Sequence, residues 1–229
     1  MGKNLRQQRR GRGFSPRYMS PWHRFIGKPQ YPEEMKTGVV TDIVHAPGRS
    51  TPLAAVDFNG EEKLIIAASG MKIGQMISSE SLGNGNIMRL RDVPEGSKIF
   101  NLELLPGDGG RLCKSSGIFA TMVTRGQDKC VILMPSKEKK TLSGLCRATM
   151  GVAASSGRVD KPFMKAGTKF FKMRTLNRMW PHTSGVHMNA VDHPFGGQTR
   201  PGKHKSVSRH MPPGKKVGSI SPRRTGKRK

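Results

Sequence analysis

Acidic residues, long apolar runs and paired cysteines are all scarce in this sequence. Only 15 Asp and Glu residues accompany 41 Lys and Arg residues in a chain of 229, so the formal net charge is +26. A chain this basic repels itself in any compact isolated state, which indicates a polyanionic partner. No stretch approaches transmembrane length, and the basic ends lack the leucines and aromatics that would insert into a membrane beside the charges. Composition therefore favours nucleic acid over a membrane.

Cysteine is limited to Cys113, Cys130 and Cys146, which are widely separated and form no C-x-x-C pair. This spacing excludes a zinc knuckle and a dithiol redox motif, and isolated thiols in odd number are typical of reduced core residues. We therefore expect a cytoplasmic rather than a secreted protein. The Arg-rich start superficially resembles an organellar transit peptide, but its Gly, Pro and Gln content disfavours the amphipathic helix of such peptides.

The positive charge is concentrated at the two ends. Basic residues outnumber acidic ones by 9 to 2 in residues 1–36, by 14 to 11 in residues 37–157 and by 18 to 2 in residues 158–229. The nearly balanced middle can fold conventionally, whereas ends this basic cannot offset chain entropy by apolar burial and should become ordered only on a partner. We predict a basic N-terminal extension over 1–36, β domains over 37–83 and 84–157, and a basic C-terminal extension over 158–229.

The middle of the chain contains short apolar runs rich in β-branched residues, which are strand signals. The expected strands are Val39–Val44, Leu53–Phe58, Leu64–Ala68, Ile99–Leu105, Ile118–Val123 and Lys129–Met134. Asn59–Gly60 and Arg125–Asp128 are expected to form hairpin turns. Helical periodicity is not sustained over three turns anywhere in the middle, although a helical turn near residues 142–147 is compatible with the pattern. The predicted fold class is all-β, and a five-stranded oligonucleotide-binding barrel fits the first domain.

The N-terminal extension is expected to be extended and to contact RNA. Prolines from Pro16 to Pro32 disfavour helix formation. Arginines can neutralise phosphates, and the aromatic side chains among them suit stacking on unpaired bases. The alternative for Trp22 and Phe25 is that they dock onto the β core. The candidate RNA-binding residues of this extension are Arg9, Arg10, Arg12, Arg17, Trp22, His23 and Arg24.

The middle contains a glycine-rich segment, P-G-D-G-G-R, over residues 106–111. Its glycines would let the backbone approach a phosphate or sugar closely, although an ordinary connecting turn needs the same freedom. Its spacing is not that of a nucleotide-binding P-loop. The candidate RNA-binding residues of the middle are Arg49, Gly107, Asp108, Gly109, Gly110, Arg111, Lys114 and Arg147.

The C-terminal extension combines dense positive charge with glycine and proline, so we expect it to be irregular alone and to thread between RNA helices. A solvated basic face is the alternative, but only Asp160 and Asp192 offset its cations, which favours phosphate contact. The candidates are Arg158, Lys161, Lys165, Lys169, Lys172, Arg174, Arg178, Asn189, His193, Gly196, Gly197, Arg200, Lys203, Lys205, Arg209, Lys215, Lys216, Arg223 and Arg224.

Within Asn189–Gly197, Asp192 is adjacent to His193, which makes an acid–base role conceivable. No nucleophile or recognisable third member lies close in the sequence. Loop ordering or RNA contact therefore explains His193 better than catalysis, and we expect no enzymatic activity. The histidines at 182, 187, 193, 204 and 210 match no zinc-binding spacing, so we expect no metal site.

A series of motifs runs along nearly the whole chain. It comprises Q-R-R-G-R-G at 8–13, H-A-P-G-R at 45–49, P-G-D-G-G at 106–110, S-S-G at 115–117, C-R-A-T-M-G at 146–151, K-P-F-M-K-A-G at 161–167, N-A-V-D-H-P-F-G-G at 189–197, P-G-K-K-V-G at 213–218 and R-T-G at 224–226. Each motif alone is weak, but the ordered series resembles the universal L2 family of large-subunit ribosomal proteins in its archaeal form.

The resemblance implies an oligonucleotide-binding-type barrel followed by an SH3-like barrel, with both extensions buried in large-subunit rRNA. It also implies neighbouring ribosomal proteins, assembly of the peptidyl-transferase region and a contact with the small subunit. No cofactor of its own is expected, and ions such as magnesium would enter with the rRNA. In the family the histidine matching His193 has been suspected of aiding peptide-bond formation, but Phe195 stands where bacterial relatives carry a second histidine. A DNA-packaging protein is the alternative that the charge alone would allow.

Overall fold

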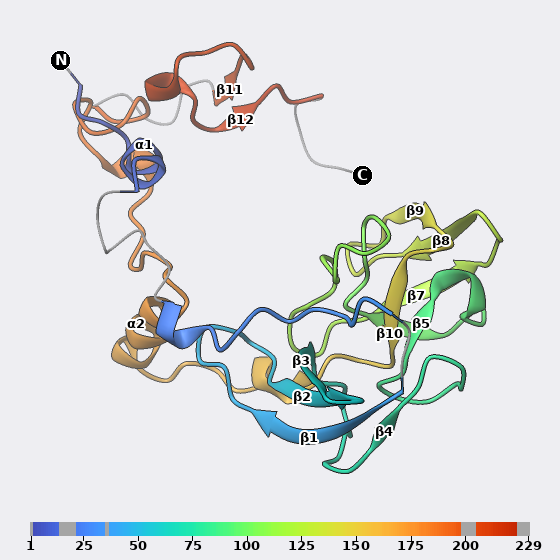
Figure 1. The fold of residues 1–229 in the computed structure, drawn as a ribbon. Helices are drawn as coiled ribbons and strands as arrows, with labels where there is room; N and C mark the ends of the chain where they lie inside the picture. The colour runs from blue at the N-terminus through green and yellow to red at the C-terminus, as the bar shows by residue number, and fades with distance from the viewer. Residues whose placement is uncertain (1, 14–21, 35–36, 198–204, 224–229) are drawn as a thin grey trace. The chain divides into compact units, whose positions relative to one another are not determined.

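The computed structural model describes residues 2–13, 22–34, 37–197 and 205–223, and the described part is mostly β (Figure 1). The chain divides into two compact units. Pro21–Thr168 forms one, called the body unit, and Met1–Ser20 together with Lys169–Lys229 forms the other, called the terminal unit. Both large sheets belong to the body unit. No helix in the described ranges is long and apolar enough to cross a membrane.

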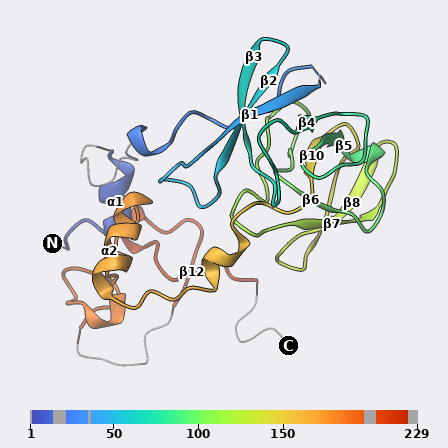
Figure 2. The same cartoon turned by 90° about the horizontal axis from the view of Figure 1, so that it is seen from below.

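The first sheet has the strand order β3-β2-β1-β4, with all neighbours antiparallel. The strands are β1 (Gly38–Val44), β2 (Leu53–Phe58), β3 (Glu61–Ile66) and β4 (Met76–Ile77). Figure 2 shows β2 and β3 as a twisted hairpin beside β1. The turn between them was predicted at Asn59–Gly60, where both residues have positive φ, at 57° and 90°. That hairpin is confirmed, while this sheet has four strands rather than five.

The second sheet has the order β5-β10-β6-β7-β8-β9. Its strands are β5 (Ile87–Arg89), β6 (Lys98–Phe100), β7 (Ala120–Thr124), β8 (Lys129–Leu133), β9 (Lys139–Ser143) and β10 (Arg147–Met150), and the short 3-10 helix η2 (Leu90–Asp92) follows β5. The predicted hairpin at Arg125–Asp128 is confirmed by the antiparallel pairing of β7 with β8. The all-β fold class is confirmed, and both curled sheets are consistent with barrel folds.

Two local predictions in the second sheet are wrong. The strand expected over Ile99–Leu105 ends at Phe100, because Asn101 takes a left-handed φ of 50° and turns the chain. The helical turn expected near residues 142–147 is instead the tight connection between β9 and β10, closed by a bond from Cys146 N–H to the Ser143 carbonyl. In both places a local backbone turn interrupts the apolar pattern, and side-chain type alone does not reveal such a turn.

The two sheets share buried surface. Ile87, Phe100 and Ala153 pack into the same apolar cluster as β1, β2 and β3. An antiparallel bridge pairs Ala68 with Ala153, and Ala154 N–H donates to the Ala67 carbonyl. A second cluster fills the interior of the β5–β10 sheet and includes the buried Cys130 and Cys146, while Cys113 lies at the edge of both clusters. All three cysteines are free thiols. The predicted boundaries at residues 36, 83 and 157 stay predictions, because the sheets are bonded into one unit.

The expectation of irregular extensions is wrong in two places. Helix α1 (Arg6–Gly11) forms in the N-terminal extension, because the first proline is Pro16 and the Leu5 N–H is capped by Gln8 Oε1 at 2.7 Å. Helix α2 (Ala166–Thr175) forms in the C-terminal extension, where Lys, Met and Arg favour helix and no proline intervenes before Pro181. It ends where Asn177 adopts a φ of 52° and Arg178 N–H bonds back to the Met173 carbonyl.

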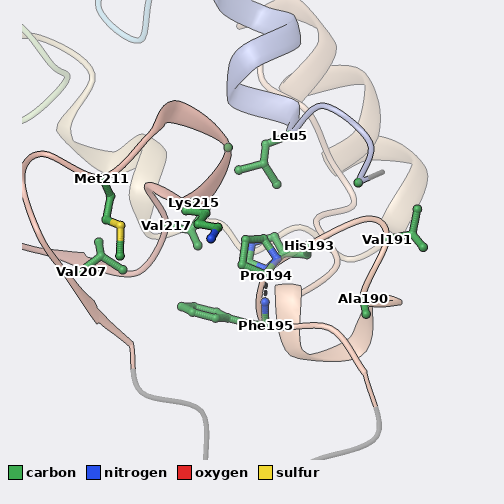
Figure 3. Close-up of a pocket in the computed structure, with 12 residues that line it drawn as sticks. Leu5, Ala190, Val191, His193, Pro194, Phe195, Val207, Met211, Lys215 and Val217 are labelled. Atoms are coloured by element: carbon green, nitrogen blue, oxygen red, sulfur yellow. Dashed lines mark hydrogen bonds between the residues drawn. The ribbon is translucent and has the colours of Figure 1, made fainter.

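Residues 2–13 and the described residues of the segment 169–229 pack together in the terminal unit. Lys3 N–H donates to the Val191 carbonyl at 2.9 Å, and Gln7 Nε2 donates to the Lys216 carbonyl at 2.8 Å. Leu5 and Val217 are buried, and they line an apolar cavity of about 590 Å3 (Figure 3). The remaining short elements are η1 (Trp22–Arg24), η3 (Ser156–Val159), η4 (Gly185–His187), η5 (Pro213–Lys215), and the parallel pair β11 (Ser206–Val207) and β12 (Ser219–Ile220).

Candidate nucleic-acid interface

Two loops that are far apart in the sequence meet on the body unit. The segment 45–52 connects β1 to β2, and residues 101–119 connect β6 to β7. Thr51 Oγ1 donates to the Lys114 carbonyl at 2.8 Å, and Ser116 N–H donates to Ser50 Oγ at 3.2 Å. These bonds bring together the H-A-P-G-R and P-G-D-G-G-R motifs, and with them their cations. We call Lys28, Arg49, Arg111 and Lys114 the basic cluster.

Arg49 enters this cluster with its guanidinium partly buried. Its Nη2 donates to the Gly27 carbonyl at 3.1 Å, and its Cζ lies 5.5 Å from the centre of the Phe25 ring. Its Nε is buried and has no hydrogen-bond partner within the described part of the chain. Burial lowers the pKa of Arg49, so desolvation disfavours its charge. Phe25 itself docks on this loop, since a Cβ at Gly48 would lie 2.8 Å from its ring.

Lys114 lies among the other cations of the cluster. Its Nζ donates to the Gly110 carbonyl at 3.0 Å. Burial is the largest cause that lowers its pKa, followed by the positive charges of Arg49 and Arg111, and Lys28 adds to them. Asp108 acts in the opposite direction. One carboxylate against four cations leaves a local excess of positive charge, which a phosphate group would neutralise.

The glycine-rich loop is held by two carboxylates. Asp108 Oδ2 accepts from the N–H groups of Leu104 and Leu105 at 3.3 and 3.4 Å, and its distance to Arg111 Nε is 3.8 Å. Glu103 Oε1 accepts from Gly109 N–H at 3.1 Å. Asp108 therefore orders the loop and positions Arg111. Gly107, Gly109 and Gly110 all have positive φ, between 77° and 87°.

Arg147 was predicted to contact RNA, and the structure assigns it a different role. It is 7% exposed, and its Nε and Nη2 donate to Glu103 Oε1 at 3.1 and 2.8 Å. Its Nη1 donates to the Pro32 carbonyl, and its Cζ lies 5.3 Å from the centre of the Tyr31 ring. The guanidinium thus binds the protein's own interior. The prediction is corrected because the Arg147 side chain itself is buried and contacts Glu103 and Tyr31.

The Asn189–Gly197 loop is ordered by its own residues. His193 Nδ1 accepts from Phe195 N–H at 3.0 Å (Figure 3). A Cβ at Gly185 would lie 2.3 Å from the His193 ring. Burial lowers the pKa of His193, which favours the neutral ring that this acceptor role requires. Asp192 Oδ1 lies 3.2 Å from Lys3 Nζ. The carboxylate next to His193 is therefore paired with the N-terminal segment.

The remaining predicted residues fall into three groups by exposure. Exposed residues are Arg9, Arg10, Arg12, His23, Gly107, Arg111, Arg158, Lys161, Lys165, Arg174, Arg178, Asn189, Gly197, Lys205, Arg209, Lys215 and Arg223. Half-buried residues are Arg24, Arg49, Asp108, Lys114, Lys169, Lys172, His193 and Lys216, whereas Gly109, Gly110 and Gly196 are buried. Predictions for Arg17, Arg200, Lys203, Arg224 and the Trp22 side chain lie outside the described residues.

The exposed Arg158 contacts the loop between β6 and β7, because its Nε donates to Ser116 Oγ at 2.8 Å. Lys28 was missed by sequence reasoning, since no local motif connects it to residues 49, 111 and 114. Among the described residues, no three His, Cys, Asp or Glu side chains are grouped so that they could hold a metal ion.

A two-sheet β body with a cluster of partly desolvated cations, joined to basic ends, defines a class of protein that binds a polyanion through a preformed surface. Two family models match the chain: "Ribosomal Proteins L2, RNA binding N-terminal domain" over residues 23–79, and "Ribosomal Proteins L2, C-terminal domain" over residues 83–216. The chain belongs to the ribosomal protein L2 family.

Three curated archaeal relatives illustrate the extent of the similarity, and each is named large ribosomal subunit protein uL2. The protein of Methanococcus aeolicus is 47% identical over 241 residues, and that of Methanothermobacter thermautotrophicus is 48% identical over 242 residues, with both chains covered completely in each comparison. The protein of Haloarcula marismortui is 45% identical over 237 residues, covering 99% of this chain and 98% of its own. The similarity thus includes both units.

Proposed function

We propose that this protein is an rRNA-binding structural constituent of the large ribosomal subunit. The family membership supports the class of ribosomal protein, and the basic cluster is the structural observation that supports contact with RNA. Arg49 and Lys114 are held in place by bonds to the protein backbone, so their charges are fixed before a ligand arrives. Preorganised cations around a glycine-rich loop suit the phosphates and sugar edges of a folded RNA.

The same fold supports a role in building the peptidyl-transferase region. The body unit supplies a rigid RNA-binding surface, and the terminal unit supplies the Asn189–Gly197 loop as a second ordered element. We infer that the protein holds rRNA segments together around that region and that it also contacts neighbouring ribosomal proteins and the small subunit. These finer partners are supported by the resemblance and by the exposed basic residues that flank both units.

The proposed role is not enzymatic and uses no cofactor of its own. A catalytic histidine would need a proton acceptor or donor poised on a reacting group. His193 instead accepts a backbone hydrogen bond through Nδ1, and the adjacent Asp192 pairs with Lys3. This geometry supports loop ordering, and any effect of His193 on translation would follow from the shape of its loop.

Sedimentation of a tagged copy in cells tests the proposal. We expect the protein to sediment with large subunits in a sucrose gradient and to remain with them after a high-salt wash, because many phosphate contacts must be released together. A copy carrying Arg49→Gln and Lys114→Gln should be depleted from large subunits, while a copy carrying Lys139→Gln, an exposed lysine on β9, should not. Sedimentation at the top of the gradient for the unsubstituted copy would refute the proposal.

A further inference from the structure

The terminal unit contains a polar groove of about 470 Å3 that both ends of the chain build together. Its N-terminal wall comes from α1, and its C-terminal wall comes from the segment that leads into the Asn189–Gly197 loop. The lining groups relevant to binding are hydrogen-bond donors, namely Arg6, Arg9, His182, Thr183, His187 and Asn189. Guanidinium, imidazole, hydroxyl and amide groups are the side chains that proteins use to bind phosphate oxygens.

One donor in this groove is buried and unsatisfied. Nη1 of Arg6 is buried without a hydrogen-bond partner among the described residues. Buried polar atoms are nearly always paired, so an orphaned guanidinium nitrogen on a residue that lines a groove points to an acceptor supplied from outside the chain. Among the described lining residues, Asp192 is the acid, and its Oδ1 lies 3.2 Å from Lys3 Nζ. The groove therefore keeps an excess of positive charge.

We propose that this groove binds a phosphodiester group of RNA, with the Arg6 guanidinium as its principal ligand. It is a second RNA-binding site, separate in sequence from the basic cluster of the body unit. The phosphate oxygens would accept from Arg6 Nη1, and Arg9 would supply further charge from the same helix. The assignment of RNA as the source of the phosphate rests on the proposed function, whereas the anion site itself rests on the groove.

The site exists only when the two ends of the chain are packed together. Lys3 N–H bonds to the Val191 carbonyl, and Gln7 Nε2 bonds to the Lys216 carbonyl, which fixes α1 against the C-terminal segment. Leu5 is 5% exposed and anchors the same contact through apolar packing. The groove thus depends on the pairing of the ends, and the N-terminal residues act as part of the C-terminal RNA-binding element.

Binding of small phosphates to the full-length purified protein tests this site without the ribosome. The probes are inorganic phosphate and a uridine trinucleotide, and the readout is the NMR signal of the His182 and His187 rings during titration. We expect both ring signals to shift with the trinucleotide at lower concentration than with phosphate. Arg6→Gln should raise the concentration required by at least about tenfold, the usual effect of losing a charge-assisted hydrogen bond.

Lys139→Gln is the control, because Lys139 is exposed on β9 of the body unit, does not line the groove and is not among the candidate RNA-binding residues. It should titrate like the unsubstituted protein. Protection of the Lys3 amide from exchange reports the bond to Val191 and must persist in Arg6→Gln. If that protection is lost, Arg6→Lys replaces Arg6→Gln, because it keeps the charge but lacks the guanidinium fork. We expect Arg6→Lys to bind the trinucleotide more weakly than the unsubstituted protein does. Equal binding by the Arg6→Gln and Lys139→Gln variants would overturn the proposal.

Two further outcomes separate this site from the proposed function. Phosphate binding that equals trinucleotide binding would overturn the assignment to a phosphodiester and leave an adventitious ion only. If the histidine rings show no response while rRNA binding still depends on Arg49 and Lys114, the groove is not a phosphate site and the proposed function is unaffected. Loss of both would refute the proposed function as well.

Discussion

Arg147 Nη2 lies 2.8 Å from Glu103 Oε1 in the interior of the body unit, where the two side chains are 9% and 0% exposed. The pair also ties three segments together. Glu103 Oε2 accepts from Arg147 N–H at 2.8 Å, Glu103 Oε1 accepts from Gly109 N–H, and Arg147 Nη1 donates to the Pro32 carbonyl. One buried carboxylate therefore fixes β10, the glycine-rich loop and, through Arg147, the segment that leads into β1.

Glu103→Gln should destabilise the body unit strongly. Removing one charge of a buried pair leaves the other uncompensated, which typically costs about 3–5 kcal/mol in the free energy of unfolding. Urea denaturation of the purified protein measures the loss. The control is Asp92→Asn, whose partner Arg91 Nε is 3.9 Å away in an exposed pair, and we expect a change within about 0.5 kcal/mol. Similar effects for the two substitutions would show that the buried pair has no special role.

Arg49→Gln and Lys114→Gln should each weaken binding to large-subunit rRNA and reduce its salt dependence. A cation that neutralises one phosphate contributes about 0.7–0.9 to the slope of log K against log salt concentration. Filter binding across a series of salt concentrations gives the slope for each variant. Lys139→Gln on β9 is the control and should leave the slope unchanged, since it lies outside the cluster. An unchanged slope in both cluster variants would show that these cations do not contact phosphate.

The sequence predicted the body unit better than it predicted the two ends of the chain, because the strands of the body unit depend on local signals. Strands β1 and β2 and the Asn59–Gly60 turn follow from local alternation and a two-residue turn signal, so they were predicted nearly residue by residue. The ends were judged from average composition, which hid a short proline-free segment at α1 and a run of helix-forming residues at α2. Charge density does predict the need for a partner, but it does not predict local order.

The residues of the candidate site also divide into those that local motifs predict and those that only the fold reveals. Arg49 and Arg111 lie in recognisable motifs and Lys114 lies between two of them, and all three were predicted from the sequence as RNA-binding residues. Lys28 joins them only through the fold, and Arg6 becomes notable only because α1 buries its guanidinium. Arg147 shows the opposite error, because a cation in a motif looks the same in sequence whether it faces phosphate or a buried glutamate. The roles of Lys28, Arg6 and Arg147 depend on long-range contacts, which cannot be recognised in a single sequence.

Two glycines of the glycine-rich loop provide a matched comparison. Gly107 and Gly110 have φ values of 84° and 87°, but a Cβ at Gly107 would meet open space, whereas one at Gly110 would lie 2.3 Å from Asn101 Oδ1. Gly107→Ala should therefore cost only the left-handed backbone penalty, roughly 1–2 kcal/mol. Gly110→Ala should cost about 3 kcal/mol or more, because the buried Asn101 must also move. Thermal unfolding ranks the two, and equal melting temperatures would contradict the packing of Gly110.

The Asn189–Gly197 loop should lose order as the pH falls. Burial lowers the pKa of His193 below its ordinary value of 6.5, so the unfolded chain takes up a proton at a higher pH than the folded loop does. The stability that this group contributes is complete above pH 6.5 and decreases as the pH falls from there through the lower pKa of the folded state. Protonation also converts Nδ1 from an acceptor to a donor, which breaks the 3.0 Å bond from Phe195 N–H.

Hydrogen exchange of the Phe195 amide, followed by NMR between pH 7.5 and about 5, measures this loss. After correction for intrinsic exchange, we expect its protection to fall with pH in the unsubstituted protein. His193→Gln removes the titrating ring, so its protection should be lower at pH 7.5 and should not change with pH. Val56 of β2, which pairs with Val40 and Lys63 in its ladder, serves as the internal reference. Protection of Phe195 that is constant across this range would mean that His193 does not hold its loop through Nδ1.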